Sequence, residues 1–232
     1  EASFKQAISL KEDFVEAHSN LGSTLKELGR LEEAESSYKQ AIALKSDFAI
    51  AYNNLGNVLK ELERLEEAES SYKQAIVLKA DFTLAYSNLG VTYMELGRLE
   101  EAEVSFKQAI AINPDLAETY NNLGVTFKKL HRMEEAESSY KQAIALKADF
   151  AEAHNNLGST LRELGRLEEA EVSYKKAIAI KPDYGEARHM LAALTGETTV
   201  TAPRDYVERV FDNYASRFEN SLVKDLEYKI PK

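Results

Sequence analysis

Apolar residues recur along the chain at intervals of three and four positions, and the whole pattern repeats every 34 residues. The first copy has Ala17, Leu21, Leu25 and Leu28, followed by Leu31, Ala34, Tyr38, Ala41 and Ile42. This spacing predicts two amphipathic helices in each copy. The five full copies are residues 15–48, 49–82, 83–116, 117–150 and 151–184, with half copies over 1–14 and 185–194.

A glycine separates the two predicted helices in three of the copies, at Gly29, Gly97 and Gly165. A residue that follows a helix in the left-handed conformation is most often glycine. Glu63 and His131 stand at the same point in the other two full copies, so we expect strained or differently closed turns there.

The starts of the first helices carry acidic residues at a fixed spacing. Asp and Glu lie three positions apart at 13–16, 115–118, 149–152 and 183–186, which predicts a capping box at each of these starts. Ile50 and Leu84 replace the glutamate in the second and third copies.

A single helical pair has no partner for its apolar stripe, so the copies are predicted to stack on one another. One glycine per copy lets the paired helices approach closely, at Gly22, Gly56, Gly90, Gly124 and Gly158. The prediction is an all-α array over residues 1–194.

The recurring set Leu21, Gly22, Leu25, Ala34, Tyr38 and Ala41 resembles the packing positions of the tetratricopeptide repeat family. Pro114 and Pro182 match the proline that this family places between repeats. The resemblance implies a right-handed superhelical solenoid of helix-turn-helix hairpins, whose first helices face the concave side. It also implies a protein-protein interaction module rather than an enzyme.

Composition narrows the function classes. The chain has a formal net charge of −10, which argues against nucleic acid as the main ligand. The acidic run of Glu32, Glu33 and Glu35 recurs in the second helices and is interpreted as a solvated outer face. No apolar stretch suggests a membrane span, and the absence of cysteine fits a cytoplasmic protein. The half copy at the start suggests a fragment of a longer protein.

No catalytic constellation is evident in the sequence. The four histidines, His18, His131, His154 and His189, fall in different copies, so we expect neither a metal site nor a cofactor. The repeated glutamate pairs follow the period of the scaffold and do not indicate an acid/base dyad.

The predicted concave face carries amide side chains in every copy. Asparagine recurs every 34 residues, and an amide can both donate to and accept from a peptide backbone. A similar ladder lines the groove of O-linked N-acetylglucosamine transferase and importin-like solenoids, which implies peptide binding. The candidate amides are Asn20, Asn54, Asn88, Asn122 and Asn156, with Asn53, Asn57, Asn121 and Asn155 beside them.

The centre of the same face is apolar where the outer copies are polar. Ile50, Leu84, Val91, Met94 and Val125 form this predicted patch, with Lys60 and Lys128 near its edge. Two alternatives stay open at this point. Ile50 and Leu84 could pack against neighbouring helices, and the asparagines could hold adjacent helices in register.

The repeat pattern ends after residue 194. Residues 195–202 are expected to be a linker, and residues 203–232 to contain an amphipathic helix. The segment 206–229 resembles the lead-in to the methyltransferase domain of bacterial repeat proteins. The sequence therefore leaves two further hypotheses, a substrate-recruiting arm of an S-adenosylmethionine-dependent methyltransferase and a self-assembling solenoid that associates through its repeat ends or this helix.

Overall fold

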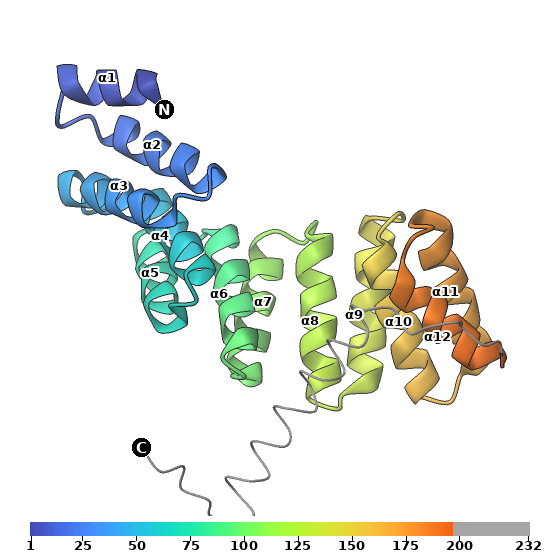
Figure 1. Ribbon diagram of the computed structural model, residues 1–232. Coiled ribbons are helices and arrows are strands. Elements are labelled where there is room, and N and C mark those ends of the chain that lie inside the picture. The colour runs from blue at the N-terminus through green and yellow to red at the C-terminus, as the bar shows by residue number, and fades with distance from the viewer. Residues whose placement is uncertain (197–232) are drawn as a thin grey trace, which may run out of the picture. The chain divides into compact units, whose positions relative to one another are not determined.

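The computed structural model describes residues 1–196, and these residues form twelve α-helices and no β-strand (Figure 1). The all-α fold predicted from the sequence is confirmed. The linker and the C-terminal helix expected after residue 194 lie outside the described residues, except Thr195 and Gly196, which end the last helix. The helices are α1 (Ala2–Leu10), α2 (Val15–Glu27), α3 (Leu31–Leu44), α4 (Ala49–Glu61), α5 (Leu65–Leu78), α6 (Thr83–Glu95), α7 (Leu99–Ile112), α8 (Ala117–Lys129), α9 (Met133–Leu146), α10 (Ala151–Glu163), α11 (Leu167–Ile180) and α12 (Gly185–Thr195).

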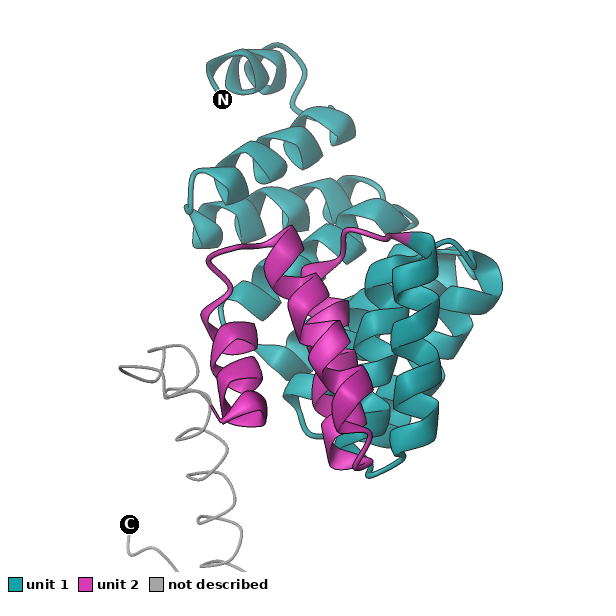
Figure 2. Ribbon diagram, turned by 90° about the vertical axis from the view of Figure 1, so that its right-hand side faces the viewer, with its two compact units in different colours: residues 1–146 teal, residues 147–232 magenta. Residues whose placement is uncertain are grey.

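The chain divides into two compact units, residues 1–146 and 147–232 (Figure 2). Unit 1 contains α1 to α9, and the described part of unit 2 contains α10 to α12. Each full copy of the sequence repeat is one pair of packed helices: α2 with α3, α4 with α5, α6 with α7 and α8 with α9 in unit 1, and α10 with α11 in unit 2.

A buried aromatic ring lies against a glycine in each of these pairs. A Cβ atom added to Gly56 would stand 2.6 Å from Cε1 of Tyr72, and one added to Gly90 would stand 2.6 Å from Cε1 of Phe106. Tyr72 and Phe106 are fully buried. The glycine of the first helix is therefore needed because the ring of the second helix occupies the space of its side chain.

The turn between the paired helices has one geometry whether or not it contains glycine. Gly97 has a φ angle of +72°, and Glu63 and His131 have φ angles of +59° and +60°. The amide N–H of Arg64 donates to the Leu59 carbonyl at 2.9 Å, just as that of Arg98 donates to Tyr93 at 2.8 Å. These turns are not closed differently, but they hold non-glycine residues in the left-handed region, which costs about 1–2 kcal/mol each.

The predicted capping boxes are wrong. The N-cap residues are Phe14, Phe48, Phe82, Leu116, Phe150 and Tyr184, and none of the six has a side-chain cap hydrogen bond. Each predicted capping aspartate lies one position earlier. In the first turn the Phe14 amide donates to the Lys11 carbonyl at 3.2 Å, which closes the chain before Asp13 reaches the capping position.

Acidic residues on the second helices tie neighbouring copies of unit 1 together instead of forming a wholly solvated face. Arg64 donates to Glu35 of the preceding copy at 2.8 Å and to Glu67 of its own helix at 2.6 Å. Arg98 and Arg132 repeat the arrangement with Glu69 and Glu103 of the preceding copies. The solvated-face expectation is therefore corrected at Glu35, Glu69 and Glu103, whose side chains are only 11–14% exposed.

The carboxylates in these ion pairs are more acidic than free glutamate. Burial raises the pKa of Glu69, but hydrogen bonds from Lys73 and Arg98 outweigh burial and leave the pKa below its usual value. The Arg98 guanidinium also lies over the Tyr93 ring, 4.5 Å from its centroid. Arg98 and Arg132 thus each combine two ion pairs with a contact to an aromatic ring at the boundary between two copies.

Candidate functional site

The first helices of unit 1 form a continuous layer. Each contacts the next, α2 with α4, α4 with α6 and α6 with α8, whereas the second helices α3, α5, α7 and α9 make no comparable contact with one another. The first helices therefore lie closer together, and this unit curves toward them. We call the solvent-facing side of α2, α4, α6 and α8 the inner face.

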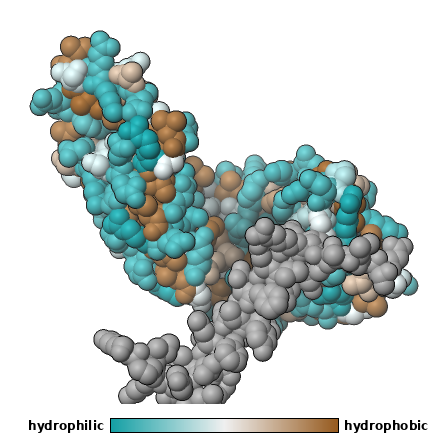
Figure 3. Space-filling view, in the orientation of Figure 1, coloured by the Kyte–Doolittle hydropathy of each residue, from teal (hydrophilic) through white to brown (hydrophobic). Residues whose placement is uncertain are grey.

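Apolar side chains are exposed at the centre of the inner face. Ile50 is 51% exposed and Leu84 is 58% exposed, so neither fills a buried packing position. Val91, Met94 and Val125 are half-buried. We call these five residues the central patch. The space-filling view shows separate hydrophobic areas on a largely hydrophilic surface over the N-terminal helices (Figure 3).

Helix α6 is apolar on both of its sides. It buries Ala85, Leu89 and Tyr93 in the array, and it places Leu84 and Met94 on the opposite, inner side. A helix at the surface of a soluble array usually carries polar residues on that side. The sequence of α6 is therefore suited to contact a further apolar surface.

The candidate asparagines differ widely in exposure. Asn53, Asn121 and Asn155 are only 4%, 9% and 1% exposed, which corrects their expected place on the exposed face. They lie one position before the recurring asparagine, on the side of the helix that meets the next copy. Of the recurring set, Asn20 is exposed, and Asn54, Asn88, Asn122 and Asn156 are half-buried, as is Asn57.

A hydrogen-bonded amide network joins α4, α5 and α6. Asn88 Nδ2 donates to Oδ1 of Asn53 and to Oδ1 of Asn57, each at 3.0 Å. Asn53 Nδ2 donates to Asn54 Oδ1 at 3.2 Å, and the Tyr72 hydroxyl donates to Asn57 Oδ1 at 2.8 Å. These amides hold two copies in register, which is the internal role that the sequence left open.

Asn20, Asn122 and Asn156 of the recurring set stand outside this network. The side chains of Asn20 and Asn122 make no hydrogen bond to any residue in the described part of the chain. Asn20 lies on α2 and Asn122 lies on α8, so the two amides flank the central patch at either end of the inner face.

The predicted lysines at the edge of the face differ from free cations. Lys60 is half-buried, and its Nζ lies 3.3 Å from Oε1 of Glu95 on the neighbouring first helix. Lys26 makes the equivalent pair with Glu61 at 2.6 Å. Lys128 is half-buried on α8. In the described chain, Lys26 and Lys60 thus stabilise the layer of first helices as well as lining its edge.

Unit 2 contains a related arrangement. Asn155 Nδ2 donates to Glu186 Oε1 on α12 at 3.0 Å, while its Oδ1 has no hydrogen-bond partner among residues 1–196. In the half copy that follows, Met190 occupies the position equivalent to Asn88, and methionine offers no side-chain N–H donor to Asn155. A buried acceptor is therefore left unpaired where the amide series ends.

Residues 5–208 match the family described as the Cilia and flagella-associated protein 70 C-terminal domain, a family of tetratricopeptide repeats. The chain belongs to this family. No curated protein matches the chain. The methyltransferase resemblance of residues 206–229 gains no support from the family match.

Solved structures share the repeat fold. YrrB, described as a tetratricopeptide repeat protein with an unusual peptide-binding site, is 26% identical, with a TM-score of 0.66 over 80% of this chain and 96% of its own. TTC0263, a thermophilic repeat protein of Thermus thermophilus, is also 26% identical, with a TM-score of 0.61 over 78% and 98%. PilF of Pseudomonas aeruginosa is 17% identical, with a TM-score of 0.72 over 91% of both chains.

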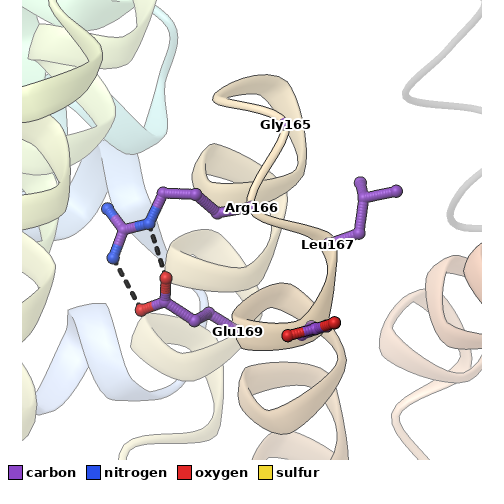
Figure 4. A pocket seen from close by; sticks show the side chains of 5 residues that line it. Gly165, Arg166, Leu167 and Glu169 are labelled. Atoms are coloured by element: carbon purple, nitrogen blue, oxygen red, sulfur yellow. Dashed lines mark hydrogen bonds and ion pairs between the residues drawn. The ribbon is translucent and has the colours of Figure 1, made fainter.

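A hollow of about 410 Å³ lies in unit 2 at the start of α11, lined by residues 165–169 (Figure 4). Arg166 and Glu169 in its wall form a double hydrogen bond, with N···O distances of 2.7 and 2.6 Å. The hollow belongs to the turn before a second helix, so it is not part of the layer of first helices.

The histidines of the first helices have structural partners. His18 Nε2 lies 3.0 Å from the Glu12 carbonyl oxygen, and His154 Nε2 lies 3.2 Å from that of Ala148. Residues 1–196 contain no group of three His, Cys, Asp or Glu side chains placed to hold a metal ion. None of the described helices is long and apolar enough to cross a bilayer.

Proposed function

We propose that the chain binds an extended peptide segment of a partner protein on the inner face, with the central patch as the main contact. The observation that carries this proposal is the exposure of Ile50 and Leu84 on helices whose opposite sides are already buried. The YrrB structure is described as having a peptide-binding site, and its resemblance to this chain supports the proposal.

Leu84 on α6 also lacks a hydrogen bond that the equivalent residue Glu186 makes within the array. In unit 2, Glu186 accepts a hydrogen bond from Asn155 of the preceding copy. Leu84 occupies the position of Glu186 in the third copy, and Asn53, which corresponds to Asn155, donates to Asn54 instead. Leu84 therefore presents apolar surface without this stabilising bond between copies, which favours a role toward a partner.

The amides divide into two roles under this proposal. Asn20 and Asn122 are available to bond a peptide backbone because their side chains have no partner among the described residues. Both N–H groups of Asn88 are occupied by Asn53 and Asn57, so Asn88 offers only its carbonyl oxygen. Binding of a backbone would thus depend more on the amides at the ends of the face.

The test uses short random peptides displayed on phage and selected against the full chain. Synthetic copies of the selected peptides are then titrated against the wild type and the double variant Ile50→Glu, Leu84→Glu. Because Glu16, Glu118 and Glu152 already occupy this position, we expect the variant to keep its melting temperature and lose the peptides.

A matched control is Val77→Glu, which changes an apolar residue that is 77% exposed on the second helix α5. It should bind the selected peptides as the wild type does. Equal binding by the wild type and the inner-face double variant would contradict the proposal. If the double variant unfolds, then Ile50 and Leu84 stabilise the array itself and the patch is not a binding surface.

Self-association is the second candidate, and one observation favours it. Helix α1 buries none of its residues, whereas α3 and α5 each bury five. Leu10 of α1 is 82% exposed. Sedimentation velocity over a range of concentrations tests it, and Leu10→Glu should abolish any concentration-dependent dimer. The methyltransferase-arm hypothesis stays a hypothesis that no described residue supports.

A further inference from the structure

Ion pairs join the first helices of unit 1 near their C-terminal ends. Lys26 Nζ lies 2.6 Å from Glu61 Oε1, and Lys60 Nζ lies 3.3 Å from Glu95 Oε1. In both pairs the two residues lie 35 positions apart in the sequence. The next pair in this series would join residues 94 and 129, on α6 and α8.

Positions 94 and 129 both differ from the equivalent positions of the neighbouring copies. Met94 stands where the neighbouring copies have lysine, and Lys129 stands where they have glutamate. Lys129 is exposed and makes no ion pair with any residue among 1–196. The step from α6 to α8 therefore replaces an internal ion pair with an apolar side chain and an unpaired cation.

This unpaired cation lies at the end of an apolar strip. Leu84, Val91 and Met94 lie on the inner side of α6, with Ser87 and Asn88 between Leu84 and Val91, and Met94 is the residue that would pair with position 129. An apolar strip alone does not select the charge of a ligand, whereas a cation at its end does.

We infer that the inner face between α6 and α8 binds a segment of a partner protein in which an acidic residue follows apolar side chains. The apolar side chains cover Leu84, Val91 and Met94, and the carboxylate pairs with Lys129. The inference rests on the proposed peptide-binding function and adds the charge and the register of the bound segment.

Charge complementarity across the face supports this occupant. The positions equivalent to Lys129 in the three preceding copies are Glu27, Glu61 and Glu95, and the chain as a whole has a net charge of −10. Glu27 repels an acidic side chain, and Glu61 and Glu95 are already paired with Lys26 and Lys60, so none of these positions offers a cation to it, whereas Lys129 does. Such a pattern places a segment in one register and disfavours the others.

The test compares the wild type with Lys129→Glu and with the double variant Met94→Lys, Lys129→Glu. Both substitutions copy residues of neighbouring copies, so neither variant should melt below the wild type, and the ion pair that the double variant restores should raise its melting temperature only slightly. Peptides selected on the wild type should be enriched in Asp or Glu after an apolar pair. They should bind Lys129→Glu about tenfold more weakly, because an attraction becomes a repulsion.

A charge exchange gives the sharper result. Replacing the acidic residue of a selected peptide with lysine should weaken binding to the wild type and restore binding to Lys129→Glu. Added salt should reduce the difference between the two peptides. If the variants bind every selected peptide as the wild type does, while Ile50→Glu, Leu84→Glu does not, the charge inference is wrong and the proposed function stands.

Two further outcomes would overturn the inference differently. If the wild type selects no peptide, the proposed function fails together with it. Sedimentation could show that the wild type forms a dimer and that the double variant Met94→Lys, Lys129→Glu does not. In that case a second copy of this chain, and not a partner segment, binds the inner face between α6 and α8.

Discussion

Replacing Glu63 with glycine should stabilise the protein, although it removes a side chain and a charge. Glu63 follows α4 with a φ angle of +59°, in the same turn that holds Gly29 and Gly97 at +72° in other copies. The left-handed conformation costs a non-glycine residue about 1–2 kcal/mol. Glycine loses more conformational entropy on folding, which offsets about 0.4–1 kcal/mol of this gain. We therefore expect Glu63→Gly to raise the free energy of unfolding by about 0.5–1 kcal/mol.

The reverse change supplies a matched control. No atom lies within 4 Å of a Cβ built on Gly97, so Gly97→Glu introduces backbone strain without a steric clash and should destabilise by a similar amount. Glu63→Ala keeps the strain and removes the carboxylate, so it should leave stability nearly unchanged. This variant separates the backbone effect from that of the charge.

Urea unfolding followed by circular dichroism measures these differences. A change in the midpoint at constant slope reports stability, whereas a change in slope reports a change in the surface exposed on unfolding. If Glu63→Gly is less stable than the wild type, or if Glu63→Ala gains as much as Glu63→Gly, then strain at this turn does not determine its stability.

Three further predictions concern packing, charge and the amide network. Gly56→Ala should destabilise by about 1–3 kcal/mol in the same urea assay, because its Cβ would meet the Tyr72 ring at 2.6 Å. The pKa of Glu69 is lowered in the fold, so its ion pairs stabilise the protein fully above the ordinary glutamate pKa of 4.5. This stabilisation is lost as the pH falls through the lowered pKa. Melting temperatures measured against pH should show the loss, and Glu69→Gln should make it smaller. Asn88→Ala should cost about 1–3 kcal/mol for two hydrogen bonds, while Asn122→Ala should leave melting nearly unchanged; equal effects would mean that the network around Asn88 does not stabilise the array.

The helices and their pairing could be predicted from the sequence because their signals are local and repeated. Apolar spacing defines each helix, and the recurrence of a glycine and an aromatic residue at the positions of Gly56 and Tyr72 identifies the packed positions. The helix starts were not predictable in the same way. An Asp-x-x-Glu spacing fits a capping box, but the backbone turn before Phe14 shifts the helix start by one residue.

The candidate site could be predicted only in outline. The polarity of neighbouring copies correctly singled out Ile50 and Leu84 as exposed apolar residues. Adjacent asparagines could not be told apart, since Asn53 and Asn54 differ by about 100° around the helix and only packing decides which of them is buried. The break at Met94 and Lys129 was visible in the sequence, but its meaning required the ion pairs of the other copies.

The arginine that joins neighbouring copies makes unit 1 modular. Arg30, Arg64, Arg98 and Arg132 each reach a glutamate 29 positions earlier. Deleting residues 83–116 would bring Arg132 to Glu69 at that same separation, because 132 − 69 − 34 = 29. The boundary contact would re-form, whereas Leu84, Val91 and Met94 would be gone. The array can therefore lose the copy that we propose selects its partner while retaining the arginine–glutamate contact between the copies on either side.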